Sequence, residues 1–198
     1  MQLMKEAASA YVALLRGINV GGHSTVPMAA LRACFEQLGF GQVRTYINSG
    51  NVIFSTSEGS SPRQLEALIE PALVKAFALD IRVIVRSAEE VRQTVAAIPA
   101  SWQHATDRKC NVIFLHHTID SPSLLEQLHP KPGIEELHYH PGVLFWSAKT
   151  SDLAKSSMVK LSRSPLYREM TVRGLSTLHA IYRLLNSLQN FHSPQTDE

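Results

Sequence analysis

The order of apolar patterns along the first 86 residues constrains the fold more than any other feature of this sequence. Four short apolar runs indicate buried strands, at residues 11–15, 42–47, 52–55 and 81–85. Apolar residues at helical spacing follow Pro27 and Pro62, which predicts a helix after the first strand and another after the third. The resulting order, strand, helix, strand, strand, helix, strand, is that of a ferredoxin-like (βαββαβ) unit.

A similar order of patterns follows in the second half of the chain. Strands are predicted at residues 110–115, 134–140, 143–147 and 167–173, with helices at 122–128 and 152–162 and a last helix across the end. We therefore predict an α+β fold of two ferredoxin-like subdomains, with mostly antiparallel sheets and helices packed on them. These subdomains cover residues 1–86 and 110–190, joined by a helix and loop at 87–109 and followed by a disordered tail at 191–198. The repeated order of elements suggests an internal duplication, which stays a hypothesis because the two halves share little residue identity.

The predicted strands do not alternate cleanly between apolar and polar residues. A sheet with one wet face shows that alternation, so both faces of the central strands are expected to be covered. Helices cover one face, and the second unit's sheet, the connecting helix or another copy of the chain covers the other. A homodimer is therefore one of the open alternatives. The second predicted helix also contains Pro71, which predicts a kink or break there.

Composition excludes several classes of protein. Nineteen basic and 17 acidic side chains give a net charge of +2, which is too balanced to indicate a polyanion partner. No apolar run approaches the length of a membrane span, and the first ten residues lack the apolar stretch of a signal peptide. Cys34 and Cys110 are the two cysteines, and a pair this far apart favours a reducing compartment over a disulfide scaffold. We therefore predict a cytoplasmic protein in which Cys34, on a helical apolar stripe, is a core residue.

Strand geometry brings two polar loops to the same end of the first predicted sheet. In this topology the first and second strands run the same way, so the loop after strand one lies beside the hairpin after strand two. These loops supply the candidate ligand-binding residues: Arg16, Asn19, Gly21, Gly22, His23, Asn48, Ser49 and Asn51. Glycine-rich backbone can aim several N–H groups at an anion, and an arginine can hold a phosphate or carboxylate through two hydrogen bonds. The sequence thus favours binding of a small anionic ligand, such as a phosphate or nucleotide.

Two other interpretations of these loops stay open. Asn and Gly residues are also typical of turns, in which case Asn19 would bond across to the hairpin. An enzyme using the same loops would depend on His23 as its base, or on a group from the second unit, since no Asp, Glu or Cys accompanies the loops. The sequence leaves the question of catalysis undecided, and it indicates no cofactor.

Several stretches of the first half resemble the hallmark of a bacterial family, the domain of unknown function 1697. The residues that carry the resemblance are Tyr11–Gly22, Val26–Met28, Leu38–Phe40 and Arg44–Phe54. The resemblance implies a cytoplasmic α+β protein built from ferredoxin-like subdomains, and it assigns no activity, cofactor or catalytic residue. The family typically has a Thr-x-Arg-Asn-Trp motif before its last helix. Here Thr171-Val172-Arg173 fits that motif, while Gly174-Leu175 replaces the Asn-Trp pair.

Four further features bear on whether the chain has other kinds of site. Four histidines, His116, His117, His138 and His140, are expected at one end of the second sheet, but without nearby Cys or carboxylate ligands we predict no metal site. Ser157-x-x-Lys160 matches a serine acyl-enzyme pattern whose companion motifs are absent. The aromatic run of an RNA-recognition motif is also absent, so nucleic-acid binding is not expected. Residues 149–183 carry seven Lys/Arg against two acidic residues, or +5, and fit either a solvated helix face or the surface of a nucleic-acid or protein adaptor.

Overall fold

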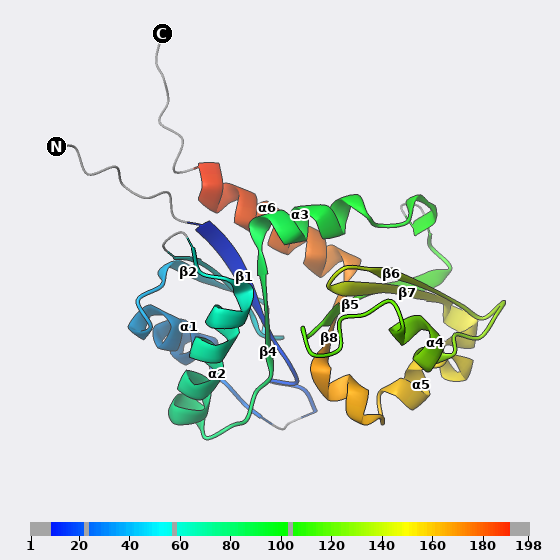
Figure 1. Cartoon of the computed structure of the whole chain (residues 1–198), viewed down its shortest axis with the longest axis horizontal. Coiled ribbons are helices and arrows are strands. Elements are labelled where there is room, and N and C mark those ends of the chain that lie inside the picture. The colour runs from blue at the N-terminus through cyan, green and yellow to red at the C-terminus, as the bar shows by residue number, and fades with distance from the viewer. Residues whose placement is uncertain (1–8, 22–23, 57–58, 103–104, 191–198) are drawn as a thin grey trace, which may run out of the picture. The chain divides into compact units, whose positions relative to one another are not determined.

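The chain divides into two compact units, each described by itself. The computed structural model describes residues 9–21, 24–56, 59–102 and 105–190. Unit 1 comprises the described residues up to Arg92 together with those from Ala180 onward, and unit 2 comprises Gln93–His179. Each unit holds one four-stranded antiparallel sheet (Figure 1). The predicted tail at 191–198 lies outside the described residues.

Unit 1 has the predicted order of elements. These are β1 (Ser9–Leu15), α1 (Met28–Gln37), β2 (Gly41–Tyr46), β3 (Asn51–Thr56), α2 (Pro62–Phe77) and β4 (Val83–Ser87), followed by α3 (Ala88–Ala96). The strand order across the sheet is β2-β3-β1-β4, and every neighbouring pair is antiparallel. Because β3 lies between β1 and β2, those two strands run in the same direction, as the topology predicts.

Unit 2 repeats the strand order with shorter helices. Its elements are η1 (Ala100–Trp102), β5 (Arg108–Leu115), α4 (Leu124–Leu128), β6 (Glu135–His140), β7 (Val143–Lys149), η2 (Thr150–Lys155), α5 (Met158–Leu161), η3 (Pro165–Glu169) and β8 (Met170–Gly174). The last helix, α6 (Leu175–Asn190), begins in unit 2 and ends in unit 1. The sheet order β6-β7-β5-β8 matches that of unit 1. The prediction of an α+β fold with antiparallel sheets is confirmed.

The segment between β7 and β8 differs from its prediction. A helix was expected at 152–162, but the chain forms the 3-10 helix η2 and the single turn α5 instead. Ser156 separates them: its backbone is extended, with ψ 160°, and its hydroxyl donates to the carbonyl of Leu153 at 2.8 Å. A serine hydroxyl bonded in this way competes with the helical backbone for the same carbonyl groups. The last strand also begins later than predicted, at Met170, because η3 occupies the residues before it.

Of the two outcomes predicted at Pro71, a kink or a break, the break does not occur. Helix α2 runs from Pro62 to Phe77 without interruption, with Pro71 inside it. The proline removes the hydrogen bond to the carbonyl of Ala67, and both residues lie on the exposed side of the helix. Water can satisfy that carbonyl there, so the helix continues.

Both faces of the unit 1 sheet are buried, as its apolar strands predict. One face packs with α1 and α2 in a core that includes Phe35, Phe54 and Leu73. On the other face, Val12 and Ile53 have no exposed surface. Cys34 belongs to the first of these cores, and burial raises the pKa of its thiol, which confirms the prediction of a core cysteine.

Candidate functional site

The side chain of Asn19 joins the two predicted site loops. Its Nδ2 donates to the carbonyls of Val26 and Asn48, each at 3.0 Å, and its Oδ1 accepts from the Val26 N–H at 2.8 Å. The bond to Asn48 links the loop after β1 to the β2–β3 hairpin across 29 residues of sequence. Asn19 therefore makes the contact that the turn interpretation predicted, and it sets the distance between the two loops.

In the backbone of the first loop, residues with positive φ alternate with residues that do not have it. Gly17, Asn19 and Gly21 have φ of +70°, +55° and +62°, whereas Ile18 and Val20 between them are not among the residues with positive φ. Alternation of this kind turns successive backbone N–H groups toward one side, which produces an anion-binding concavity. The Asn19 N–H is already bonded, to the carbonyl of Ser24 at 3.1 Å.

The hairpin contributes two structural residues to this end of the sheet. Asn51 is fully buried, and its Nδ2 donates to the carbonyl of Tyr46 at 3.0 Å and to Ser49 Oγ at 3.1 Å. Gly50 has φ of +74°, and a Cβ there would lie 2.8 Å from Leu15 Cβ. Asn48 is exposed and Ser49 is half-buried. Asn51 thus maintains the turn, while Asn48 and Ser49 are placed where a ligand can reach them.

Arg16 lies at the end of β1, where its N–H donates to the carbonyl of Arg82 at 3.0 Å. Its side chain is half-buried. Two further candidates, Gly22 and His23, lie outside the described residues. The structure therefore places Arg16, Asn19, Gly21, Asn48, Ser49 and Asn51 at one end of the unit 1 sheet.

Sequence analysis missed a second arginine at this end. Arg82 precedes β4, and its Nη1 forms an ion pair with Glu70 on α2, 3.2 Å from Oε2. The other oxygen of Glu70 accepts from the Val83 N–H at 2.9 Å. The signal was present in the topology, since β4 is antiparallel to β1 and must begin where β1 ends. The Glu70 carboxylate partly balances the charge of Arg82, so this residue adds less positive charge to the site than a solitary arginine would.

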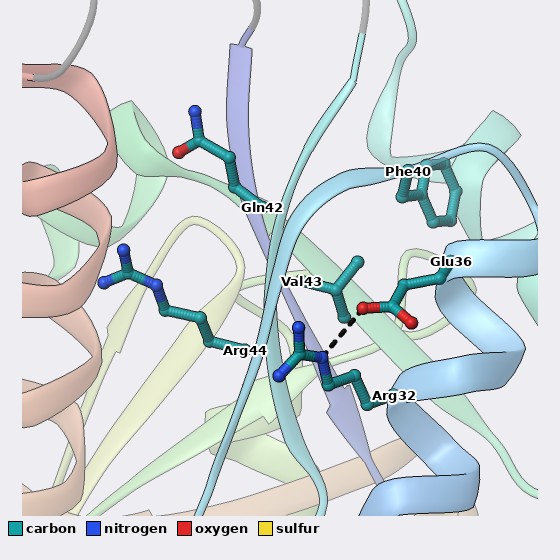
Figure 2. A pocket seen from close by; sticks show the side chains of 6 residues that line it. All are labelled: Arg32, Glu36, Phe40, Gln42, Val43 and Arg44. Carbon is teal, nitrogen blue, oxygen red and sulfur yellow. Dashed lines mark hydrogen bonds and ion pairs between the residues drawn. The ribbon is translucent and has the colours of Figure 1, made fainter.

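A groove beside β2 also contains two arginines, but it does not gather their charges. This groove of about 480 Å³ is lined by Arg32, Glu36, Phe40, Gln42, Val43 and Arg44. Figure 2 shows Arg32 and Glu36 on the α1 side of the strand, while Arg44 points to the opposite side. Arg32 is paired with Glu36 at 2.8 Å, and Arg44 lies 3.4 Å from Ser187 on α6. The two guanidinium groups therefore face different sides of β2, and the groove does not bring their charges together.

The corresponding end of unit 2 carries histidine and acidic residues in place of arginine. His116 is 4% exposed, and its Nδ1 lies 2.8 Å from Thr118 Oγ1 and 3.2 Å from Glu169 Oε2. The rings of His116 and His117 are in contact, with their centroids 4.0 Å apart. The Nδ1 of His140 instead lies 3.2 Å from the carbonyl of Pro141. Thr118 and Glu169 thus orient the ring of His116.

The basic segment at 149–183 is not the single helix face that one interpretation predicted. It runs through η2, α5, η3, β8 and the start of α6. Arg173 is 7% exposed within β8, and its Nη1 donates to Thr171 Oγ1 at 2.7 Å and to the carbonyl of Val172 at 2.9 Å. Burial lowers the pKa of Arg173 to about 10. The positive charges of this segment are therefore divided between the buried Arg173 in β8 and exposed side chains on the other elements of the segment.

Comparisons with known proteins place the chain among uncharacterised relatives. No curated protein matches it. Among solved structures, it is similar to the conserved bacterial protein SP0830 from Streptococcus pneumoniae, with 28% sequence identity and a TM-score of 0.80 over 90% of this chain and 99% of that one. An unknown protein from Galdieria sulphuraria is 14% identical over 84% of this chain and 96% of its own, at a TM-score of 0.26 that supports no argument about the fold. No described helix is long and apolar enough to cross a membrane.

One family model accounts for most of the chain. The model for proteins of unknown function designated DUF1697 matches residues 8–145, which include both site loops, β5, β6 and the start of β7. The match agrees with the hallmark stretches of the first half, and the chain therefore belongs to the DUF1697 family of proteins of unknown function.

Proposed function

We propose that unit 1 binds a small anionic ligand, bearing a phosphate or carboxylate, at the loops after β1 and β2. The backbone of residues 17–21, with its alternating φ, is the observation that carries this proposal. Backbone N–H groups turned to one side supply fixed donors, and Arg16 immediately before them supplies a permanent positive charge. These groups are of the kinds that bind phosphate and carboxylate groups in proteins.

The eight predicted site residues take different roles in this proposal. Asn19, Asn51 and the turn around Gly50 hold the loops in place, because their polar atoms are bonded to backbone and neighbouring side chains. Arg16, Gly21, Asn48 and Ser49 are the groups we assign to ligand contact. Gly22 and His23 continue the first loop in the sequence and are assigned with them.

Binding is favoured over catalysis at this end of the sheet. The Glu70 carboxylate is committed to Arg82 and to the Val83 N–H, so it is not poised to move a proton. A general base must reach the proton that it abstracts and have a lone pair to accept it. The described loops supply hydrogen-bond donors in greater number than bases, which suits recognition of an anion.

Titration with inorganic phosphate and with a nucleoside monophosphate tests the proposal. We expect either anion to raise the unfolding temperature of the protein, with a stabilisation of about 1.4 kcal/mol at tenfold excess over its dissociation constant. Arg16→Ala should remove this stabilisation while leaving the unfolding temperature without ligand nearly unchanged.

Arg32→Ala is the matched control, since it removes one exposed arginine of unit 1 whose partner is Glu36. It should leave the anion-dependent stabilisation intact. The proposal fails if neither anion stabilises the protein, or if Arg16→Ala and Arg32→Ala reduce the effect equally. A collapse of basal stability in Arg16→Ala, without any anion effect in the wild type, would show that Arg16 is structural.

A further inference from the structure

Unit 2 contains a partly open cavity, and the described residues that line it all belong to unit 2. Its volume is about 230 Å³, and it lies where the end of α4, the chain leading to β6, α5 and η3 meet. At about 30 Å³ for each water-sized group, this space corresponds to about eight non-hydrogen atoms. It is therefore the size of one substituted aromatic ring or a short aliphatic chain.

The walls of the cavity combine an apolar body with positive charge. Leu128, Leu161 and Leu166 form the apolar part. Lys131 and Lys160 also line it, and none of its described lining residues is acidic. An apolar lining with a few polar groups is typical of sites for small organic molecules.

A buried carboxylate holds the cavity together. Glu135, which is 7% exposed, accepts through Oε1 from the N–H groups of Lys131 at 2.9 Å and Ser157 at 2.8 Å. Its Oε2 accepts from Trp146 Nε1 at 2.7 Å. Burial opposes ionisation of this carboxyl, but the hydrogen bonds from Trp146, Lys131 and Ser157 outweigh it and hold the pKa of Glu135 below its ordinary value. Two segments that line the cavity are thus fixed by one group that stays charged.

Two lysines and a serine supply polar groups to the cavity. Lys160 is exposed at the edge of the cavity, and Lys131 Nζ donates to the carbonyl of Lys155. Ser164 lines the cavity, and its Oγ is a buried hydroxyl for which the described residues offer no hydrogen-bond partner. A buried polar group without a partner costs about 1–3 kcal/mol, so a ligand group bonded to it would be favoured.

We propose that this cavity binds a small organic anion with an apolar body of about one aromatic ring and a single carboxylate or phosphate group. The three leucines receive the apolar body, and the anionic group lies toward Lys131 and Lys160. The spacing of Ser157 and Lys160 matches an acyl-enzyme pattern, but in this proposal the two residues bind the ligand and form no acyl-enzyme. This proposal rests on residues of unit 2 alone and stands independently of the loop site in unit 1.

Titration of the full chain with benzoate, phenyl phosphate and benzamide tests the proposal by amide chemical shifts. We expect benzoate or phenyl phosphate to bind with a dissociation constant in the millimolar range and to shift the amides of Lys131, Ser157 and Leu161. The stronger of the two identifies the anionic group. Benzamide has the size of benzoate without its charge, so it should bind about tenfold more weakly, as expected for loss of a charged hydrogen bond.

Matched lysine variants locate the site. Lys160→Gln should weaken binding of the preferred anion about tenfold, because it removes one charge at the rim. Lys75→Gln, an exposed position on α2 of unit 1, changes the net charge equally and should leave the affinity unchanged. Arg16→Ala should also have no effect, which separates this site from the loops of unit 1.

Three outcomes would overturn the proposal. The first is that neither anion produces saturable amide shifts at the cavity residues. The second is that benzamide binds as tightly as benzoate. The third is that Lys160→Gln and Lys75→Gln reduce the affinity for the anion to the same extent. Failure of phosphate to stabilise the protein through Arg16 would leave these results unaffected.

Discussion

Units 1 and 2 end their first strands with the same backbone hydrogen bonds. Leu15 N–H donates to the carbonyl of Gly50 at 2.8 Å, and Leu115 N–H donates to that of Gly142 at 2.9 Å. The next residue in each unit bonds to the residue before the last strand: Arg16 to Arg82 at 3.0 Å, and His116 to Glu169 at 2.9 Å. The two units therefore share a backbone frame at this end of the sheet.

The side chains on that frame differ in chemistry. In unit 1 Asn19 clamps the hairpin by donating to the carbonyl of Asn48. In unit 2 Asp120 performs the clamp as an acceptor, from the Gly142 N–H and the Tyr139 hydroxyl, each at 3.0 Å. The comparison teaches that the same hydrogen bonds between backbone groups form the loop path in both units, while the side chains placed on that path differ.

The shared frame extends to the last strand of each sheet. Arg86 of β4 lies opposite Val12, and Arg173 of β8 lies opposite Val112. Both arginines are 7% exposed, and each donates to the carbonyl of the residue before it. A buried arginine at the same register in two units with little sequence identity supports the hypothesis of an internal duplication.

The largest expected effect breaks the frame in unit 1. Gly50→Ala adds a methyl group 2.8 Å from Leu15 Cβ at a residue with φ of +74°. We expect a loss of about 3 kcal/mol of unfolding free energy, from left-handed strain and overpacking together. Amide hydrogen exchange should show the loss in β1 and β3 before it appears in β5 and β7.

Gly39→Ala separates the two causes. This residue has φ of +85°, but a Cβ there meets nothing within 4 Å. Its cost should therefore be the strain alone, about 1 kcal/mol. Equal losses in the two variants would show that the contact with Leu15 is unimportant.

The next effect concerns the buried carboxylate of Glu135, which bonds to two segments that line the unit 2 cavity. Glu135→Gln should lower the unfolding free energy by about 2 kcal/mol at neutral pH, since an amide cannot accept from all the donors that surround Glu135. Hydrogen bonds hold the pKa of Glu135 below its ordinary value in the folded state. The stabilisation is therefore complete above the pKa of the unfolded chain and is lost as the pH falls through the lower folded value.

Urea unfolding at a series of pH values measures this difference. The gap between wild type and Glu135→Gln should narrow on acidification. Glu136→Gln is the neighbouring control, because the ion pair of Glu136 with Arg108 is half-exposed and should contribute less than about 1 kcal/mol. A gap that is constant with pH would contradict the role of the Glu135 charge.

The smallest expected losses of unfolding free energy come from removing the side chains of Asn19 and Asp120, which bond to the hairpins of units 1 and 2. Asn19→Ala removes three hydrogen bonds and should cost about 1.5 kcal/mol, whereas Asp120→Ala removes two and should cost about 1 kcal/mol. Hydrogen exchange should assign the first loss to the unit 1 hairpin and the second to the unit 2 hairpin. Loss of protection in the opposite hairpin would show that the clamps are coupled and do not act as separate devices.

Much of the site frame could be predicted from the sequence, because it follows from strand order. Antiparallel pairing with β3 between β1 and β2 brings Arg16, Asn19 and Asn48 to one end, and the sequence patterns indicated that order. The same reasoning would have found Arg82, which precedes a strand antiparallel to β1. The cavity of unit 2 was beyond such reasoning, since Ser157 and Lys160 lie at the single-turn helix α5, which is too short for apolar periodicity to specify its path.

The sequence by itself determined the α+β class, the two sheets and their strand order, because apolar periodicity decides which residues can be buried in strands and helices. It also determined that both sheet faces are covered, since Val12 and Ile53 are apolar on the face away from α1 and α2. Only the tertiary structure decided which polar groups are committed to the frame. The sequence left open whether Asn19 contacts a ligand or bonds to the hairpin, and the fold shows the bond to the hairpin. Glu135 accepts from three donors that lie on separate segments of the chain. The physical reason is that a hydrogen-bonding side chain acquires its role from the partners that distant segments bring to it, and local sequence does not name those partners.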